Sequence, residues 1–210
     1  EFTDIEKAEW EYRADKLPCL LWLDSDDPDG LAGTDNEKIA KANMTRYPFI
    51  KPYRDRAENK YQWCIAAVPG KAWAKKVFPN LDEDKAVEEL WNAILYTSRV
   101  TEDPIAEWKK HNENLAARCK FLNDYRFDTL EYSSSNGTNF TVGLNEKGIF
   151  CGGGETALGS GIYFNPNIPS EEVFTTPMRG RADGKVISTK PLSYQGKLIE
   201  NFWVEFKDGK

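Results

Sequence analysis

Two stretches of helical periodicity constrain what this chain can fold into more than any other feature. Residues 81–100 carry acidic residues in the expected first turn, followed by five apolar residues at helical spacing: Val87, Leu90, Trp91, Ile94 and Leu95. Residues 102–127 start a second helix with Pro104 directly behind Asp103, and its apolar stripe consists of Ile105, Trp108, Leu115, Cys119 and Leu122. The sequence therefore predicts two amphipathic helices in the middle of the chain.

The residues before these helices alternate between strand and helix patterns. We predict a buried strand at 19–23 that runs into an acidic loop, and a second strand at 61–69. Between them, a helix is expected to begin at a cap on Thr34 or Asp35 and to stop before Pro48. A short helix is expected at 70–79. Alternation of this kind predicts an α/β layer.

From about residue 128 the sequence pattern becomes typical of short strands and hairpins. Thr, Tyr, Phe, Ser and Gly become frequent, and turn signals occur at Asn136-Gly137 and at 145–148. Residues 198–209 are predicted to form one strand that enters a turn. The whole chain is therefore expected to be α+β, with the helices up to about Phe127 and a β-rich portion after it.

Composition narrows the classes of function. The formal net charge is -6 and the pI is about 5.1, which argues against nucleic acid or an anionic membrane as the main partner. No apolar run approaches the length of a membrane span, and the N-terminal residues lack the pattern of a signal peptide. The 4 cysteines form no CxxC pair, so we expect buried free thiols in a reducing compartment.

Two short motifs suggest ligand sites, but neither matches the residue pattern that such a site requires. The acidic run that starts at Asp24 has Pro28 at the fifth position and Asp35 at the twelfth, which does not fit a calcium-binding EF-hand loop. Residues 151–161 lack the Lys-Ser/Thr of a phosphate loop and the dinucleotide fingerprint, and Glu155 would repel phosphate. We predict a solvated acidic turn in the first case, and in the second a sharp bend or close backbone approach at 152–154.

The chain has 1 histidine, His111, on the stripe of the second predicted helix. One histidine without an identified partner does not make a nucleophilic centre. We expect a helix-face residue packed against its neighbours.

Two adjacent carboxylates, Glu171 and Glu172, allow two interpretations. Ser170 could cap a helix whose first turn holds both glutamates. However, the β-branched and aromatic residues that follow reach Pro177 quickly and leave little room for a helix. If the segment is extended, neighbouring residues face opposite sides, and only one of the two carboxylates can point into a given site.

Several segments, in order along the chain, resemble the metal-dependent aminopeptidases of the aminopeptidase T, S and II group. The resemblance runs from about Asp24 to Lys210, and the segments are PYRDRAENKYQWCIAAVPGKAWAKKVFP, ELWNAILYTSRV, DPIAEWKKHNENLAARCKFLN, GTNFTVGL, GGGETALGSGIYFNPNIPSEEVFTTP and TKPLSYQGKLIENF. It implies a cytoplasmic, dimeric exopeptidase that removes N-terminal residues from peptides with two zinc or cobalt ions. The family motif Pro-[Ser/Thr]-x-Glu-Val-Phe-Thr places its metal-ligand glutamate directly before the valine, which is Glu172 here.

The resemblance also implies what this chain does not contain. The family's other ligands, a Glu, two His, a Tyr and an Asp, correspond to positions after Lys210, and its first strands and helices to positions before Glu1. Residues 1–127 would then be the latter part of an N-terminal α/β domain, and residues 128–210 the first part of a β-rich catalytic domain. We expect the isolated chain to be inactive and to bind zinc weakly. The alternative is a non-catalytic dimerisation or peptide-binding module derived from that family.

Overall fold

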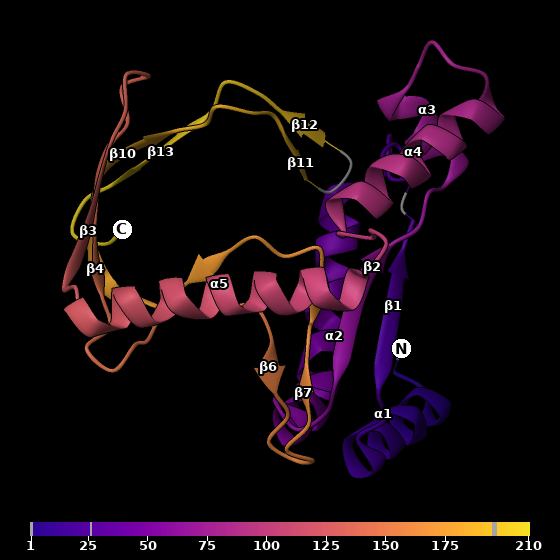
Figure 1. The fold of residues 1–210 in the computed structure, drawn as a ribbon, viewed down its shortest axis with the longest axis horizontal. Coiled ribbons are helices and arrows are strands. Elements are labelled where there is room, and N and C mark those ends of the chain that lie inside the picture. Colours follow the sequence, from indigo (N-terminus) through magenta and orange to yellow (C-terminus); the bar gives the residue numbers. More distant parts are fainter. Residues whose placement is uncertain (1, 26, 195–196) are drawn as a thin grey trace. The chain divides into compact units, whose positions relative to one another are not determined.

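The computed structural model of the protein describes residues 2–25, 27–194 and 197–210 (Figure 1). Helices and short sheets are mixed along these ranges, so the predicted α+β class is confirmed. Within the described ranges, no helix has an apolar stretch long enough to cross a bilayer.

The chain forms two compact units. Unit 1 comprises Glu1–Glu102 together with Gly154–Ser170, and unit 2 comprises Asp103–Gly153 together with Glu171–Lys210. Residues 154–170 are therefore a segment of unit 1 inserted between two stretches of unit 2. The assignment of 1–127 and 128–210 to two domains of a larger enzyme stays a prediction.

Unit 1 contains a parallel three-stranded sheet and four helices. The sheet order is β1-β2-β8, and both strand pairs are parallel. The elements of this unit are α1 (Asp4–Lys16), β1 (Leu20–Asp24), α2 (Asn36–Ala57), β2 (Trp63–Ala67), α3 (Lys71–Val77), α4 (Glu83–Thr97), β6 (Glu155–Thr156), β7 (Tyr163–Phe164) and β8 (Asn167–Ile168).

Helices α3 and α4 pack side by side (Figure 1). They hold a buried hydrophobic cluster of unit 1. The Asp82 carboxylate caps α4 by accepting a hydrogen bond from the Lys85 N–H at 3.1 Å. Leu90 and Ile94 lie one turn apart on the buried face of α4, and Ala74 of α3 is fully buried against them. The predicted apolar stripe is confirmed for Leu90 and Ile94, whereas Trp91 and Leu95 are exposed.

Strand β1 corrects one expectation. The strand exists, but the structure leaves Leu21 63% exposed and Leu23 60% exposed, so it is not a buried strand. Leu21 and Leu23 are two residues apart and lie on the same face of β1, and the described part of the chain leaves that face open. The strand is also the outer one in the order β1-β2-β8.

Helix α2 corrects a second expectation. Asp35 caps the helix as predicted, but the helix continues through Pro48 and Pro52 to Ala57. A proline inside a helix removes a backbone hydrogen bond and usually ends it. Here both halves are held to α1, because Arg46 pairs with Glu6 before Pro48, and Arg56 lies 2.9 Å from Asp15 after it. Tertiary contacts override the local signal.

Unit 2 combines one long helix with antiparallel sheets. Its largest sheet has the order β13-β10-β4-β3, and the elements are α5 (Pro104–Tyr125), β3 (Thr129–Ser133), β4 (Asn139–Leu144), β5 (Cys151–Gly152), β9 (Val173–Phe174), β10 (Pro177–Ile187), β11 (Leu192–Tyr194), β12 (Lys197–Ile199) and β13 (Trp203–Phe206). The predicted turns at Asn136-Gly137 and at 145–148 are confirmed. The single strand expected at 198–209 is wrong, because Asn201 adopts a left-handed φ of 52° and separates β12 from β13.

A bidentate ion pair fastens β10 to the start of β3. The Arg181 guanidinium donates to both carboxylate oxygens of Asp128, at 2.9 and 2.6 Å. Hydrogen bonds from Arg181 and from the Thr129 hydroxyl hold the pKa of Asp128 down at about 2. Arg181 crosses β4 at Gly143, where a Cβ atom would lie 2.4 Å from the Arg181 Nε atom.

We expect Leu90→Ala to destabilise unit 1 strongly. Leu90 is 4% exposed, and removing a buried leucine leaves a cavity that costs roughly 2–5 kcal/mol. Leu95→Ala is the matched control on the same helix, because Leu95 is 38% exposed, and we expect a smaller loss. Urea unfolding followed by circular dichroism measures both. Equal losses for the two variants would contradict the assignment of the buried face.

Candidate functional site

The segment that holds Glu171 and Glu172 leads into a strand. Neither residue is helical, and both lead directly into β9. The interpretation of this pair as the start of a helix capped by Ser170 is therefore wrong. The alternative of an extended segment agrees with the strand β9 that begins at Val173, directly after Glu172.

Strand β5 fixes the backbone of this segment at close range. It pairs antiparallel with β9, so that Gly152 lies opposite Val173 and Cys151 opposite Phe174. A Cβ atom on Gly152 would lie 2.5 Å from the backbone oxygen of Glu172. Only glycine allows this approach without a shift, so the close backbone contact expected at 152–154 is confirmed, and its partner is Glu172.

Helix α5 in turn fixes the start of β5. The Asn123 side chain donates to the Phe150 carbonyl at 3.0 Å and accepts from the Phe150 N–H at 2.7 Å, so both backbone groups of that residue are satisfied. Three residues after Phe150, Gly153 has a φ of 78°, and a Cβ atom on Gly153 would lie 3.5 Å from the Cβ of Leu115. Leu115 is 3% exposed. The glycine bend therefore rests directly on the buried face of α5.

His111 lies on α5 and faces the same segment. Its ring meets the Trp108 ring edge to face, with centroids 5.6 Å apart and an interplanar angle of 84°. The Nε2 atom lies 4.0 Å from Oε2 of Glu171, and the His111 side chain is 9% exposed. The expected packing against helix neighbours is present. The approach to Glu171 was not predicted.

The stripe predicted for α5 is partly wrong. Leu115 and Cys119 are buried, whereas Ile105 at the first turn is 83% exposed. Burial raises the pKa of the Cys119 thiol and of the half-buried Cys64 thiol. Cys19 is exposed, so the expectation of buried free thiols holds for Cys119 and fails for Cys19.

The residues near Glu172 do not complete a metal site by themselves. Glu172 is exposed, so its carboxylate is free to meet a cation. Among the described residues, however, no group of three or more His, Cys, Asp or Glu side chains could hold a metal ion. Among the residues that the structure describes, the Asn112 Oδ1 atom has no hydrogen-bond partner; it is buried and would lie 3.3 Å from a Cβ atom on Gly153. The role of Glu172 as a metal ligand stays a prediction.

In the acidic run after β1, residues 28–33 form a turn, and Asp26 lies outside the described residues. The Asp29 N–H donates to the Asp27 carboxylate at 2.9 Å, and Lys76 lies 2.8 Å from Asp29. Carboxylates that are satisfied by a backbone donor and a lysine fit the predicted solvated turn.

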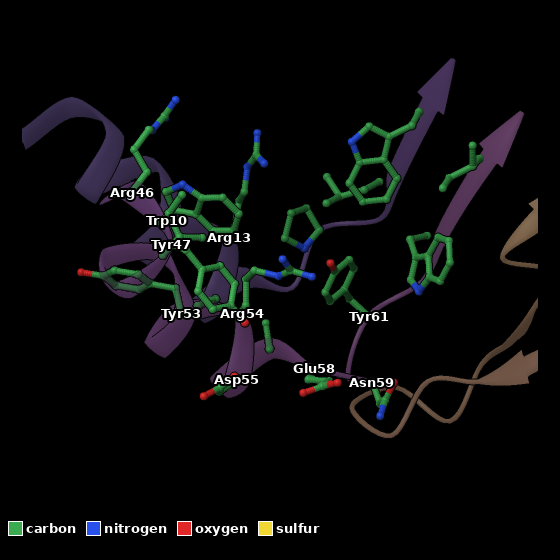
Figure 2. A pocket seen from close by; sticks show the side chains of 18 of the residues that line it. Trp10, Arg13, Arg46, Tyr47, Tyr53, Arg54, Asp55, Glu58, Asn59 and Tyr61 are labelled. Carbon is green, nitrogen blue, oxygen red and sulfur yellow. The ribbon is translucent and has the colours of Figure 1, made fainter. Parts of the chain in front are cut away.

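A cavity of about 880 Å³ lies in unit 1, between the helices α1 and α2 and the strands β1 and β2. Figure 2 shows Trp10 and Tyr47 with Arg13 and Arg46 on the helix side, and Tyr61 on the other side. Sequence patterns did not predict this cavity, because its walls come from four separate elements. Its lining contains neither glutamate of the candidate site nor His111.

Comparisons with known proteins place the chain in a family. The sequence matches the family described as thermophilic metalloprotease (M29) over residues 1–210. Aminopeptidase PepS of Streptococcus thermophilus is 43% identical over 213 residues, covering 100% of this chain and 51% of that protein. Aminopeptidase 2 of Geobacillus stearothermophilus is 38% identical over 212 residues, covering 100% of this chain and 51% of that protein.

A solved structure agrees with these matches. Wild-type AmpT from Thermus thermophilus superposes with a TM-score of 0.84 at 34% sequence identity, covering 96% of this chain and 50% of that one. The chain therefore spans about half the length of the relatives it matches.

We expect Gly152→Ala to disturb the Glu172 segment. The new methyl group would press on the Glu172 carbonyl, and overpacking of this kind costs roughly 1–3 kcal/mol. Gly180→Ala is the control in unit 2, because nothing lies within 4 Å of its Cβ position and only the φ of 86° is strained. Hydrogen exchange should rise at residues 172–174 in the first variant alone. Unchanged exchange there in Gly152→Ala would contradict the close contact.

Proposed function

This chain belongs to the thermophilic metalloprotease (M29) family, and from that membership we propose that it is part of a metallo-aminopeptidase. The proposed enzyme hydrolyses N-terminal residues from peptides with two divalent metal ions, and Glu172 supplies one metal ligand. The ions are zinc or cobalt, and the enzyme is a cytoplasmic homodimer. The relatives named as aminopeptidases support the activity.

The observation that carries the choice of Glu172 is that its segment is not helical and runs directly into the strand β9. On an extended chain, neighbouring side chains point to opposite sides, so Glu171 and Glu172 cannot both enter one site. The structure turns Glu171 toward His111 of α5, at 4.0 Å. Glu172, whose backbone is held at Gly152, is the one that remains for a ligand on the other side.

A glutamate suits this role chemically. An anionic carboxylate oxygen binds a divalent ion, partly offsets its charge, and can bridge two ions. Bound ions of this kind polarise the scissile carbonyl and lower the pKa of a water molecule. The described residues contribute the exposed carboxylate of Glu172 and the backbone contact with Gly152 behind it.

The second candidate function is a non-catalytic dimerisation or peptide-binding module. The cavity of unit 1 favours it, because aromatic walls and arginine side chains suit a peptide chain with a carboxylate. Hydrolysis of aminoacyl-nitroanilides by the whole protein that carries this chain, with and without a chelator, separates the two functions. Activity that the chelator abolishes supports the enzyme, and binding of peptide without turnover supports the module.

We expect Glu172→Gln to reduce kcat/KM of the whole protein by at least about 100-fold, the upper end of the range for changes in a metal's outer shell. The substitution keeps the shape of the side chain and removes the anionic charge that a metal ion requires. Glu113→Gln is the matched control, because Glu113 is an exposed carboxylate on α5. The measurement is steady-state hydrolysis together with the metal content of each purified variant. Full activity in Glu172→Gln would contradict the assignment.

A further inference from the structure

The local sequence does not determine which of the two carboxylates, Glu171 or Glu172, faces a ligand. Both are glutamates, and β9 is a strand of 2 residues. A short strand specifies its register weakly, and a slip of one residue in its pairing with β5 would exchange the faces of the two carboxylates. Gly152, which lies opposite Val173, has no side chain with which to resist such a slip.

His111 opposes an exchange of the two carboxylates. The imidazole is nearly buried on α5, and the Trp108 ring meets it edge to face, so its orientation is set from within the helix. Its Nε2 atom faces the Glu171 carboxylate, which is 65% exposed. The distance of 4.0 Å is longer than a direct hydrogen bond and fits charge attraction or one bridging water.

We propose that His111 is a positioning residue for the Glu172 carboxylate. By holding Glu171 on the α5 side, the imidazole assigns Glu172 to the opposite side of the extended chain, where it can act as a ligand. The backbone contact at Gly152 sets how far the segment lies from β5, and His111 sets which face it presents. This inference rests on the proposed function, in which Glu172 is a metal ligand.

The test compares two substitutions of His111 in the whole protein that carries this chain. His111→Phe keeps a ring that can pack on Trp108 but removes the nitrogen that faces Glu171. His111→Gln gives up the ring and keeps an N–H donor. Zinc affinity, measured by competition with a chromophoric chelator, should fall about 10-fold in His111→Phe, in the range found for groups that orient metal ligands. His111→Gln should lie closer to the wild type than to His111→Phe.

A second readout needs no metal. Hydrogen exchange of the metal-free protein over residues 170–175 should accelerate in His111→Phe, while the melting temperature stays near that of the wild type. The double variant His111→Phe/Glu171→Gln should lose no more zinc affinity than His111→Phe alone, because both changes break one contact. Wild-type zinc affinity and exchange in His111→Phe would overturn the proposal. So would equal losses in His111→Gln and His111→Phe, since ring packing would then be the role of His111.

Glu172→Gln separates this failure from a failure of the proposed function. If Glu172→Gln loses zinc and His111→Phe does not, the positioning role is wrong and the ligand assignment stands. If Glu172→Gln binds zinc as the wild type does, the ligand assignment itself is wrong.

Discussion

The candidate site depends on the way the strand pair β5–β9 is seated on helix α5. Leu115 is buried where the glycine bend rests on the helix, and Asn123 satisfies both backbone groups of Phe150 at the start of β5. These contacts need no catalytic side chain. They determine where the backbone of Glu172 lies, because β5 approaches that backbone so closely that Gly152 cannot carry a side chain.

Residues 154–170 belong to unit 1, and the chain returns to unit 2 at Glu171. Within unit 2, this segment is held by the contact with Gly152, by the approach of His111, and by the hydrogen bond that the Asn145 N–H donates to the Thr176 carbonyl at 3.0 Å. A single helix thus supports the backbone of the candidate ligand and the side chain beside it.

Local patterns were sufficient where local forces decide the structure. The periodicity of Leu90 and Ile94 and the caps at Asp82 and Asp103 determine α4 and the start of α5. Local patterns failed at α2, which continues past Pro48 with contacts to α1 on both sides of that proline. They also failed at β1, where an apolar sequence lies on a face that the described part of the chain leaves open.

In the candidate site, too, local sequence predicts some features, and contacts between distant residues determine others. The β-branched residues after Glu172 favoured an extended chain, and alternation then separated the two glutamates. The meeting of His111 with Glu171 and the walls of the unit 1 cavity join residues far apart in sequence, so one sequence without relatives gives no signal for them.

The central claim is that Glu172 is one ligand of a metal site that the described residues of this chain do not complete. Isothermal titration of the 210-residue chain with zinc tests it most directly. The account predicts weak binding without a defined stoichiometry, because one exposed carboxylate cannot hold two ions. Tight binding of one or two equivalents of zinc would contradict it.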